Sequence, residues 1–146
     1  MYSNILIAIE HSDADRTVLD HVRQLATLTG AALLLVHVAD GWAARHYEEL
    51  KLRDSEEMKE DRAYLERIAE DLSSQGFPTR TRLAMGDPAT QLIKVAQEER
   101  VDLIAMSTHG HRFINDLLRG STADRVRHSV EVPVLMIRAA KVQVRV

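Results

Sequence analysis

Short apolar segments alternate along the chain with longer segments in which apolar and charged residues are mixed. The short segments are nearly continuous in Ile, Leu, Val and Ala, which is typical of strands buried on both faces of a sheet. The longer segments repeat apolar residues at a spacing of three or four, as one face of an α-helix does. The alternation therefore predicts an α/β protein.

The elements follow from these segments and from the glycines and prolines between them. The predicted strands are residues 4–10, 31–38, 79–84, 102–106 and 133–137, and the predicted helices are residues 13–29, 47–74, 89–100 and 121 to about 130. Gly30 marks the end of the first helix, and Pro88 lies near the start of the third. The alternating polar residues of 79–84 indicate a strand at the edge of the sheet.

Right-handed crossovers between these strands predict an open, mostly parallel sheet with helices on both faces. In such sheets, ligands bind beyond the carboxyl ends of the strands where the strand order reverses. If the first and fourth strands are neighbours at that point, residues 10–12 face residues 107–110 across one crevice.

Residues 101–122 carry the clearest chemical signal. The apolar run 103–106 ends in a turn containing Gly110, and nine residues separate that glycine from Gly120, which precedes the helical pattern beginning at Ser121. Glycine allows another group to approach the backbone closely, and free amides at a helix N-terminus favour an anion. The pattern predicts a phosphate cradle. A purely structural glycine turn, or a capping box between Ser121 and Asp124, explains the same residues without a ligand.

Composition narrows the class of protein. The 146 residues suit a single domain, 1–146, with 45% apolar and 28% charged residues, and no apolar run is long enough to cross a bilayer. The acidic N-terminus is a poor secretory signal and cysteine is absent, so we expect a cytoplasmic protein. A net charge of −3 argues against general nucleic-acid binding.

The motif residues resemble those of the universal stress protein family. Its pattern after the fourth strand is Gly, two residues, Gly, nine residues, Gly, then Ser or Thr, and here the corresponding residues are Ser107, Gly110, Gly120 and Ser121. Similarity extends over nearly the whole chain, through the segments ILIAIEHS, LLLVHV, MGDPATQLI and VRHSVEVPVLMIR.

The resemblance implies a Rossmann-like sheet of five strands in the order 3-2-1-4-5 and a cytoplasmic, usually dimeric protein. In the nucleotide-binding branch of the family, ATP lies between the first and fourth strands. Adenine then lies near the ends of the first and second strands, and the phosphates lie on the glycine loop. ATP or AMP is therefore the expected ligand, with Mg²⁺ carried on the phosphates.

Glu10 falls where that branch usually has an Asp that contacts ribose or base, and Val38 matches a position that meets adenine through its backbone. The expected nucleotide site comprises Ile9, Glu10, Val38, Met106, Ser107, His109, Gly110, His111, Arg112, Gly120, Ser121 and Thr122. Two departures from the family pattern matter. Ser107 replaces the first motif glycine, and Glu10 is longer than Asp, so we expect weakened or altered binding, which makes smaller ligands such as AMP more plausible.

Histidines 37, 109 and 111 suggest a metal site as an alternative. Residues i and i+2 of a loop usually point apart, and no carboxylate or cysteine spacing accompanies these histidines, so we expect no metal held by protein ligands alone. We expect His109, His111 and Arg112 to line the anion site as hydrogen-bond donors.

Three functions remain open from the sequence. The favoured one is a stress-response binding module that holds an adenine nucleotide as a regulatory ligand. An enzyme, either a slow ATPase or a nucleotidyl transferase, lacks support because the chain has no Gly-Lys-Ser phosphate loop, and His109-Gly-His111 lacks the transferase spacing. The third is a dimeric interaction protein that acts without nucleotide.

The C-terminal residues alternate Lys141, Gln143 and Arg145 with valines, a period of two that suits a strand. A final strand at the edge of the sheet recruits another strand unless it is blocked. We therefore expect a two-fold homodimer through residues 132–137 and the tail valines, as the family resemblance also implies. A frayed tail whose Lys and Arg block the edge is the alternative.

Overall fold

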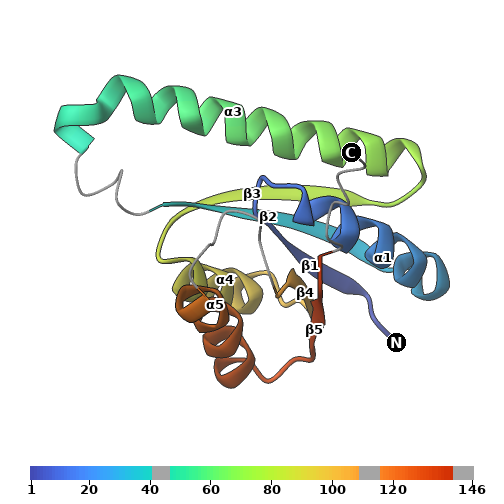
Figure 1. Ribbon diagram of the computed structural model, residues 1–146. Helices are drawn as coiled ribbons and strands as arrows, with labels where there is room; N and C mark the ends of the chain where they lie inside the picture. Colours follow the sequence, from blue (N-terminus) through green and yellow to red (C-terminus); the bar gives the residue numbers. More distant parts are fainter. Residues whose placement is uncertain (41–46, 109–115, 140–146) are drawn as a thin grey trace, which may run out of the picture.

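The computed structural model describes residues 1–40, 47–108 and 116–139, and for residues 40, 47–55 and 116–121 it describes the backbone alone. Strands and helices alternate along the chain (Figure 1). In chain order they are β1 (Asn4–Ile9), α1 (Ala14–Thr29), β2 (Ala32–Asp40), α3 (Tyr47–Ser74), β3 (Thr79–Gly86), α4 (Pro88–Glu98), β4 (Leu103–Ser107), α5 (Asp116–Ser129) and β5 (Val134–Ile137).

The five strands form one parallel sheet in the order β3-β2-β1-β4-β5, which confirms the predicted order. β1 lies at the centre between β2 and β4, while β3 and β5 form the two edges. The predicted edge position of residues 79–84 is therefore correct. Among the described residues, no helix combines the length and apolar character needed to span a bilayer.

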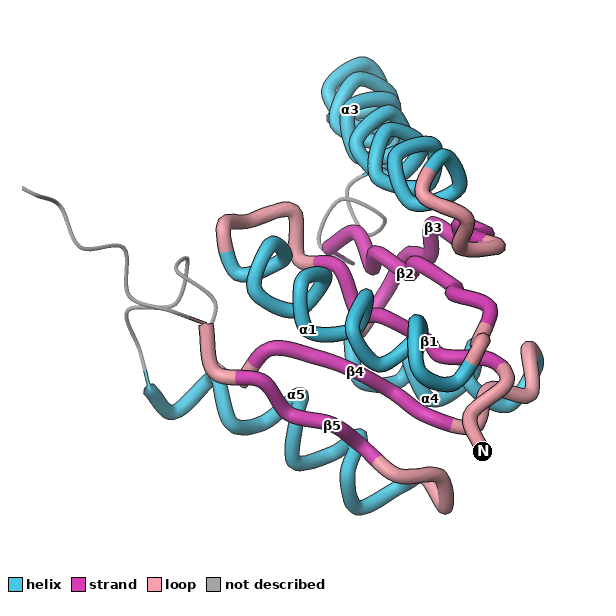
Figure 2. The backbone as a smooth tube through the Cα atoms, turned by 90° about the vertical axis from the view of Figure 1, so that its right-hand side faces the viewer, coloured by secondary structure: helices cyan, strands magenta, loops and turns pink. Residues whose placement is uncertain are grey.

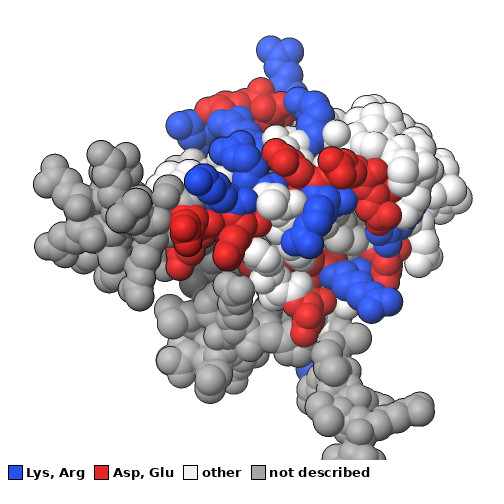
Figure 3. Space-filling model, turned by 90° about the horizontal axis from the view of Figure 1, so that it is seen from above, with Lys and Arg blue, Asp and Glu red and all other residues white. Residues whose placement is uncertain are grey.

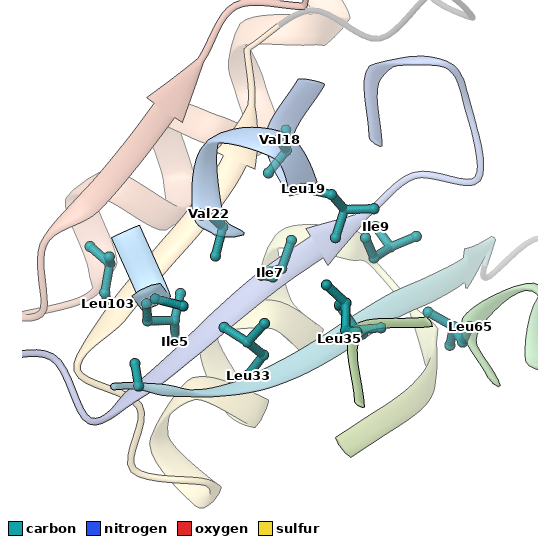
Figure 4. Packing of buried hydrophobic residues seen from close by; sticks show 14 residues of the cluster. Ile5, Ile7, Ile9, Val18, Leu19, Val22, Leu33, Leu35, Leu65 and Leu103 are labelled. Carbon is teal, nitrogen blue, oxygen red and sulfur yellow. The ribbon is translucent and has the colours of Figure 1, made fainter. Parts of the chain in front are cut away.

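Helices cover both faces of the sheet, α1 and α3 on one side and α4 and α5 on the other (Figures 1 and 2). Successive side chains of β1 point to opposite faces, so this strand contributes to two cores. Ile5 and Ile7 pack with Val18 of α1 and Leu65 of α3 (Figure 4). Leu6, one residue away, packs into the second core, with α4 and α5.

Helix boundaries follow local rules at α1 and α4. Gly30 ends α1 in the left-handed conformation, with φ of 72°, and its N–H donates to the Ala26 carbonyl at 2.8 Å. Asp87 caps α4 by accepting a 3.0 Å hydrogen bond from the amide of Thr90, and Pro88 occupies the first helical position. Both predicted boundary signals are confirmed.

The start of α5 differs from the prediction. This helix begins at Asp116 rather than Ser121, so Gly120 and Ser121 lie within its first turns. A glycine inside a helix costs only about 1 kcal/mol relative to alanine, which the preceding Leu117, Leu118 and Arg119 offset as good helix formers. A helix N-terminus at Ser121, with Asp124 completing a capping box, is therefore wrong. Asp124 instead accepts a 3.1 Å hydrogen bond from Arg127.

Candidate functional site

The carboxyl ends of β1, β2 and β4 lie side by side where these strands terminate. This boundary of the sheet is termed the carboxyl edge, as distinct from the edge strands β3 and β5. In the parallel register Ile9 lies opposite His37, and Ile7 lies opposite Ala105. From β1 the chain turns into α1 on one face, whereas from β4 it continues toward α5 on the other face. The predicted reversal of strand order between β1 and β4 is thus present in the structure.

Several predicted site residues belong to this edge. Glu10 directly follows β1 and is half-buried, and Ser107 ends β4 with only 7% of its surface exposed. Val38 is half-buried near the end of β2. Ile9 and Met106 are also at the edge, but their side chains are buried in opposite cores.

The remaining predicted residues belong to the glycine loop and α5. Thr122 is half-buried in α5, and the backbone of Gly120 and Ser121 is helical. His109, Gly110, His111 and Arg112 lie outside the described residues.

The loop between β1 and α1 is shaped by Asp15, a residue outside the predicted site. Its carboxylate is 1% exposed and accepts hydrogen bonds from the backbone amides of Glu10, His11 and Ser12 at 2.7, 2.8 and 3.0 Å. A short acidic side chain in the first turn of a helix is well placed to accept from the amides that precede it. The acidic residue two positions after Ser12-Asp13 is therefore the feature of the sequence that could have indicated this role.

These bonds hold an unusual backbone. His11 has φ of 64°, the left-handed region that non-glycine residues rarely adopt. Because Asp15 occupies the three loop amides, they are not available to bind a phosphate. The side chain of Ser12 donates to Oε2 of Glu10 at 3.1 Å, which orients that carboxylate. This side of the edge suits hydroxyl or base donors rather than an anion.

Helix α3 packs against the same loop through two residues one turn apart. Oδ1 of Asp61 lies 2.7 Å from Nδ1 of His11, and Tyr64 stacks on the His11 ring at 4.0 Å between centroids. The Tyr64 hydroxyl donates to Asp15 at 2.7 Å. Burial, reinforced by this hydrogen bond to a carboxylate, raises the pKa of Tyr64 well above its ordinary value. Tyr64 is therefore a neutral donor at any physiological pH.

His37, one of the three histidines considered for a metal, has other partners. Its Nδ1 lies 2.7 Å from the Ile9 carbonyl oxygen, and its Nε2 lies 3.4 Å from Oδ2 of Asp61. Within the described ranges, no three His, Cys, Asp or Glu side chains are grouped as metal ligands.

Charges on the α3 side are mixed. Figure 3 shows Lys and Arg interspersed with Asp and Glu over this face. Glu56, Glu57, Lys59 and Glu60 of α3 are exposed and form a solvated helix face.

Known proteins share this architecture. A universal stress protein of Methanocaldococcus jannaschii, MJ0577, is 28% identical over 158 residues, covering 94% of this chain and 96% of the relative. Its solved structure has a TM-score of 0.82, with 97% of this chain and 99% of that chain covered. Two structures at 23% identity share the fold. A universal stress protein in complex with cAMP has a TM-score of 0.66 and covers 95% and 98% of the two chains. One from Archaeoglobus fulgidus in complex with dAMP has a TM-score of 0.68 and covers 94% and 98%.

The family model described as "Universal stress protein family" matches residues 1–138, nearly the whole chain. Together with the strand order and the arrangement at the carboxyl edge, this match identifies the chain as a member of the universal stress protein family.

Proposed function

We propose that this chain is a cytoplasmic stress-response protein that binds an adenine nucleotide, ATP or AMP, as a regulatory ligand. The nucleotide lies at the carboxyl edge of the sheet, with ribose and base beside Glu10 and Val38 and phosphates toward the glycine loop. The observation that carries the proposal is the adjacency of β1 and β4 in a parallel sheet. This adjacency brings the half-buried carboxylate of Glu10 and Ser107, the first residue of the glycine motif, to the carboxyl edge.

Two further points support an adenosine group on the β1 side. Glu10 offers acceptor oxygens for ribose hydroxyls, while the neighbouring amides are bonded to Asp15. Family members in complex with cAMP and with dAMP share this fold. The phosphates accordingly belong on the opposite side, with His109, Gly110, His111, Arg112, Gly120, Ser121 and Thr122. Any Mg²⁺ arrives bound to them.

Ser107 favours a nucleotide with one phosphate over a nucleotide with three. Its Cβ and hydroxyl stand where the family motif has glycine, so close approach of a triphosphate is restricted while the amide remains a donor. We propose AMP as the preferred ligand. Turnover is negligible, far below the roughly 1 to 100 s⁻¹ typical of kinases, because the chain lacks a phosphate-loop lysine. Phosphate release near one per second that disappears on mutation of His109 or His111 would instead establish an enzyme.

Isothermal titration calorimetry with AMP, ADP and ATP tests the binding. Wild type should bind, and Gly120→Leu should abolish binding because its side chain fills the space that a phosphate requires. Ser129→Leu adds the same side chain at the exposed far end of α5 and should bind like wild type. Circular dichroism checks that both variants are folded. Absence of heat with any adenine nucleotide at millimolar concentration would overturn the proposal and favour a nucleotide-independent interaction protein.

A further inference from the structure

His11 stands just beyond β1 with a backbone conformation that suits glycine better than histidine. Its φ of 64° lies in the left-handed region, which is uncommon for residues with a side chain, although histidine is enriched there several-fold. Glycine adopts such angles at no steric cost. The chain therefore keeps a side chain at a position where the backbone disfavours one, which directs attention to what that side chain contacts.

The left-handed backbone gathers three successive amides. A left-handed residue within a turn lets neighbouring N–H groups converge into a concave arrangement that binds an anion. Here the amides of Glu10, His11 and Ser12 converge on the carboxylate of Asp15 at 2.7, 2.8 and 3.0 Å. Asp15 is 1% exposed and lies in the first turn of α1, so the acceptor itself is fixed. The conformation of the loop thus depends on both this acid and the positive φ of His11.

Helix α3 holds the side chain of His11. Its Nδ1 lies 2.7 Å from Oδ1 of Asp61, and the ring of Tyr64 stacks on the imidazole with 4.0 Å between centroids. The Tyr64 hydroxyl donates in turn to Asp15. The backbone of His11 is therefore anchored to α1 and its side chain to α3.

Glu10 and Ser12, the two neighbours of His11, meet through their side chains. The Ser12 hydroxyl donates to Oε2 of Glu10 at 3.1 Å. Because the turn at His11 sets where Ser12 lies relative to Glu10, a different φ at His11 would move the donor that orients this carboxylate.

We propose that His11 is a positioning residue whose anchored, left-handed backbone holds Ser12 against Glu10 and thereby aims the Glu10 carboxylate at the ribose hydroxyls of the nucleotide. The site then selects a ribose with free hydroxyls, because a carboxylate accepts hydrogen bonds from them and repels a further phosphate. The selectivity rests on the proposed nucleotide function, whereas the role of the left-handed backbone does not.

Two replacements of His11 separate its backbone from its side chain. His11→Gly and His11→Val both remove the contacts with Asp61 and Tyr64. Glycine adopts a φ of 64° readily, whereas a β-branched residue resists it. The matched control is His21→Val, because His21 is an exposed residue within α1.

Calorimetry then compares AMP with dideoxyadenosine monophosphate, which lacks both ribose hydroxyls. We expect wild type and His21→Val to bind AMP about tenfold or more tightly than the dideoxy compound, since hydrogen bonds to a carboxylate are strong. His11→Gly should keep most of this preference and His11→Val should lose most of it. A purely structural defect would weaken both ligands equally. An undiminished preference in His11→Val, or equal losses in His11→Gly and His11→Val, would overturn the proposal.

Ser12→Ala is a second variant that decides the matter if circular dichroism shows that His11→Val does not fold. It removes the hydroxyl that orients Glu10 and leaves the Ser12 amide bonded to Asp15. Affinity for AMP should fall about threefold or more, with affinity for the dideoxy compound unchanged. A preference as large as that of wild type would overturn the role of the contact between Ser12 and Glu10.

Urea unfolding without nucleotide tests the backbone part alone. The midpoint should be higher for His11→Gly than for His11→Val, whereas His21→Val should be at least as stable as His21→Gly, because glycine is the poorer helix former. A midpoint of His11→Val equal to or above that of His11→Gly would overturn the role of the left-handed backbone.

The two assays distinguish failure of the inference from failure of the proposed function. Equal affinity of wild type for AMP and the dideoxy compound would overturn the selectivity and leave nucleotide binding intact. If wild type binds neither compound, the proposed function and the selectivity fail together, and urea unfolding still decides the backbone role of His11.

Discussion

The hydroxyl of Tyr64 in α3 donates a 2.7 Å hydrogen bond to Oδ2 of Asp15 in α1, across 49 positions of sequence. The same carboxylate holds the backbone that leads out of β1. One buried acid therefore joins a long helix, a short loop and the carboxyl edge of the sheet where the nucleotide is proposed to bind.

Replacement of Asp15 by alanine should destabilise the protein strongly. It leaves three loop amides and the Tyr64 hydroxyl without their acceptor, and a buried donor left unpaired costs about 1 to 3 kcal/mol. We expect a loss of roughly 3 kcal/mol in the free energy of unfolding, measured by urea titration. Asp13→Ala is the matched control, because Asp13 is exposed and its side chain makes no cap hydrogen bond. It should change stability by less than about 0.5 kcal/mol. Similar losses in both variants would contradict the anchoring role of Asp15.

Tyr64→Phe should cost about 1 kcal/mol, since it removes one hydrogen bond and keeps the ring on His11. Burial and the hydrogen bond to Asp15 raise the pKa of Tyr64 in the folded protein. As pH rises, the unfolded chain therefore loses the tyrosine proton at a lower pH than the folded chain does. The stability that Tyr64 adds is therefore fully present below the ordinary tyrosine pKa of about 10 and is lost as pH rises above it. Unfolding measured at pH 8 and at pH 10.5 should show the wild-type advantage shrinking. An advantage that stays constant or grows would contradict this assignment.

Most of the fold was predictable because the hydrophobic periodicity and the positions of glycine and proline indicate the same elements along this chain. The run from Ile5 to Ile9 is buried throughout, as a central parallel strand requires, and Gly30 and Pro88 mark helix ends by their backbone preferences. The start of α5 was missed because Gly120 was interpreted as a loop residue. In the structure the helix formers before it carry the helix through that position.

Asp87→Ala should destabilise α4 by about 1 kcal/mol, the usual cost of losing an N-cap. Hydrogen bonds from Thr90, with further help from Arg125, hold the pKa of Asp87 below its ordinary value. A lowered pKa means that this stability is present above the unfolded value, near 4, and is lost as pH falls through the folded value. The difference between wild type and Asp87→Ala should thus be constant from pH 5 to 7 and shrink below about pH 4. A difference that persists at pH 2 would show that the charge does not matter. Glu131→Ala, which removes an exposed acid outside α4, serves as control.

The free edge at β5 leads to a prediction about assembly. All four residues of β5 are half-buried in the single chain, and no strand follows it in the described part of the sheet. We expect a two-fold dimer through residues 132–137, with added apolar contact from the tail valines. Light scattering of the full chain and of a chain ending at Arg138 tests this expectation. A monomeric full chain would rule out the dimer, whereas a dimer that survives truncation would show that the tail is dispensable.

The candidate site was less accessible from sequence than the fold. Glu10 and Ser107 were predicted because they directly follow or end buried strands. Asp15, Asp61 and Tyr64 were not, because their importance comes from contacts across the chain and from the left-handed backbone at His11, which no local pattern encodes. Ile9 and Met106 belong to the expected nucleotide site, yet the pleat turns their side chains into the cores.

The most direct test of the account is to follow backbone amide signals by ¹⁵N NMR while AMP is added. We predict shifts at the carboxyl ends of β1, β2 and β4, at residues 9–12, 38–40 and 107–108, with none at the opposite edge of the sheet around Asn4, Ala32 and Asp102. Signals that stay unchanged at millimolar AMP, or that move only at that opposite edge, would contradict nucleotide binding at the carboxyl edge.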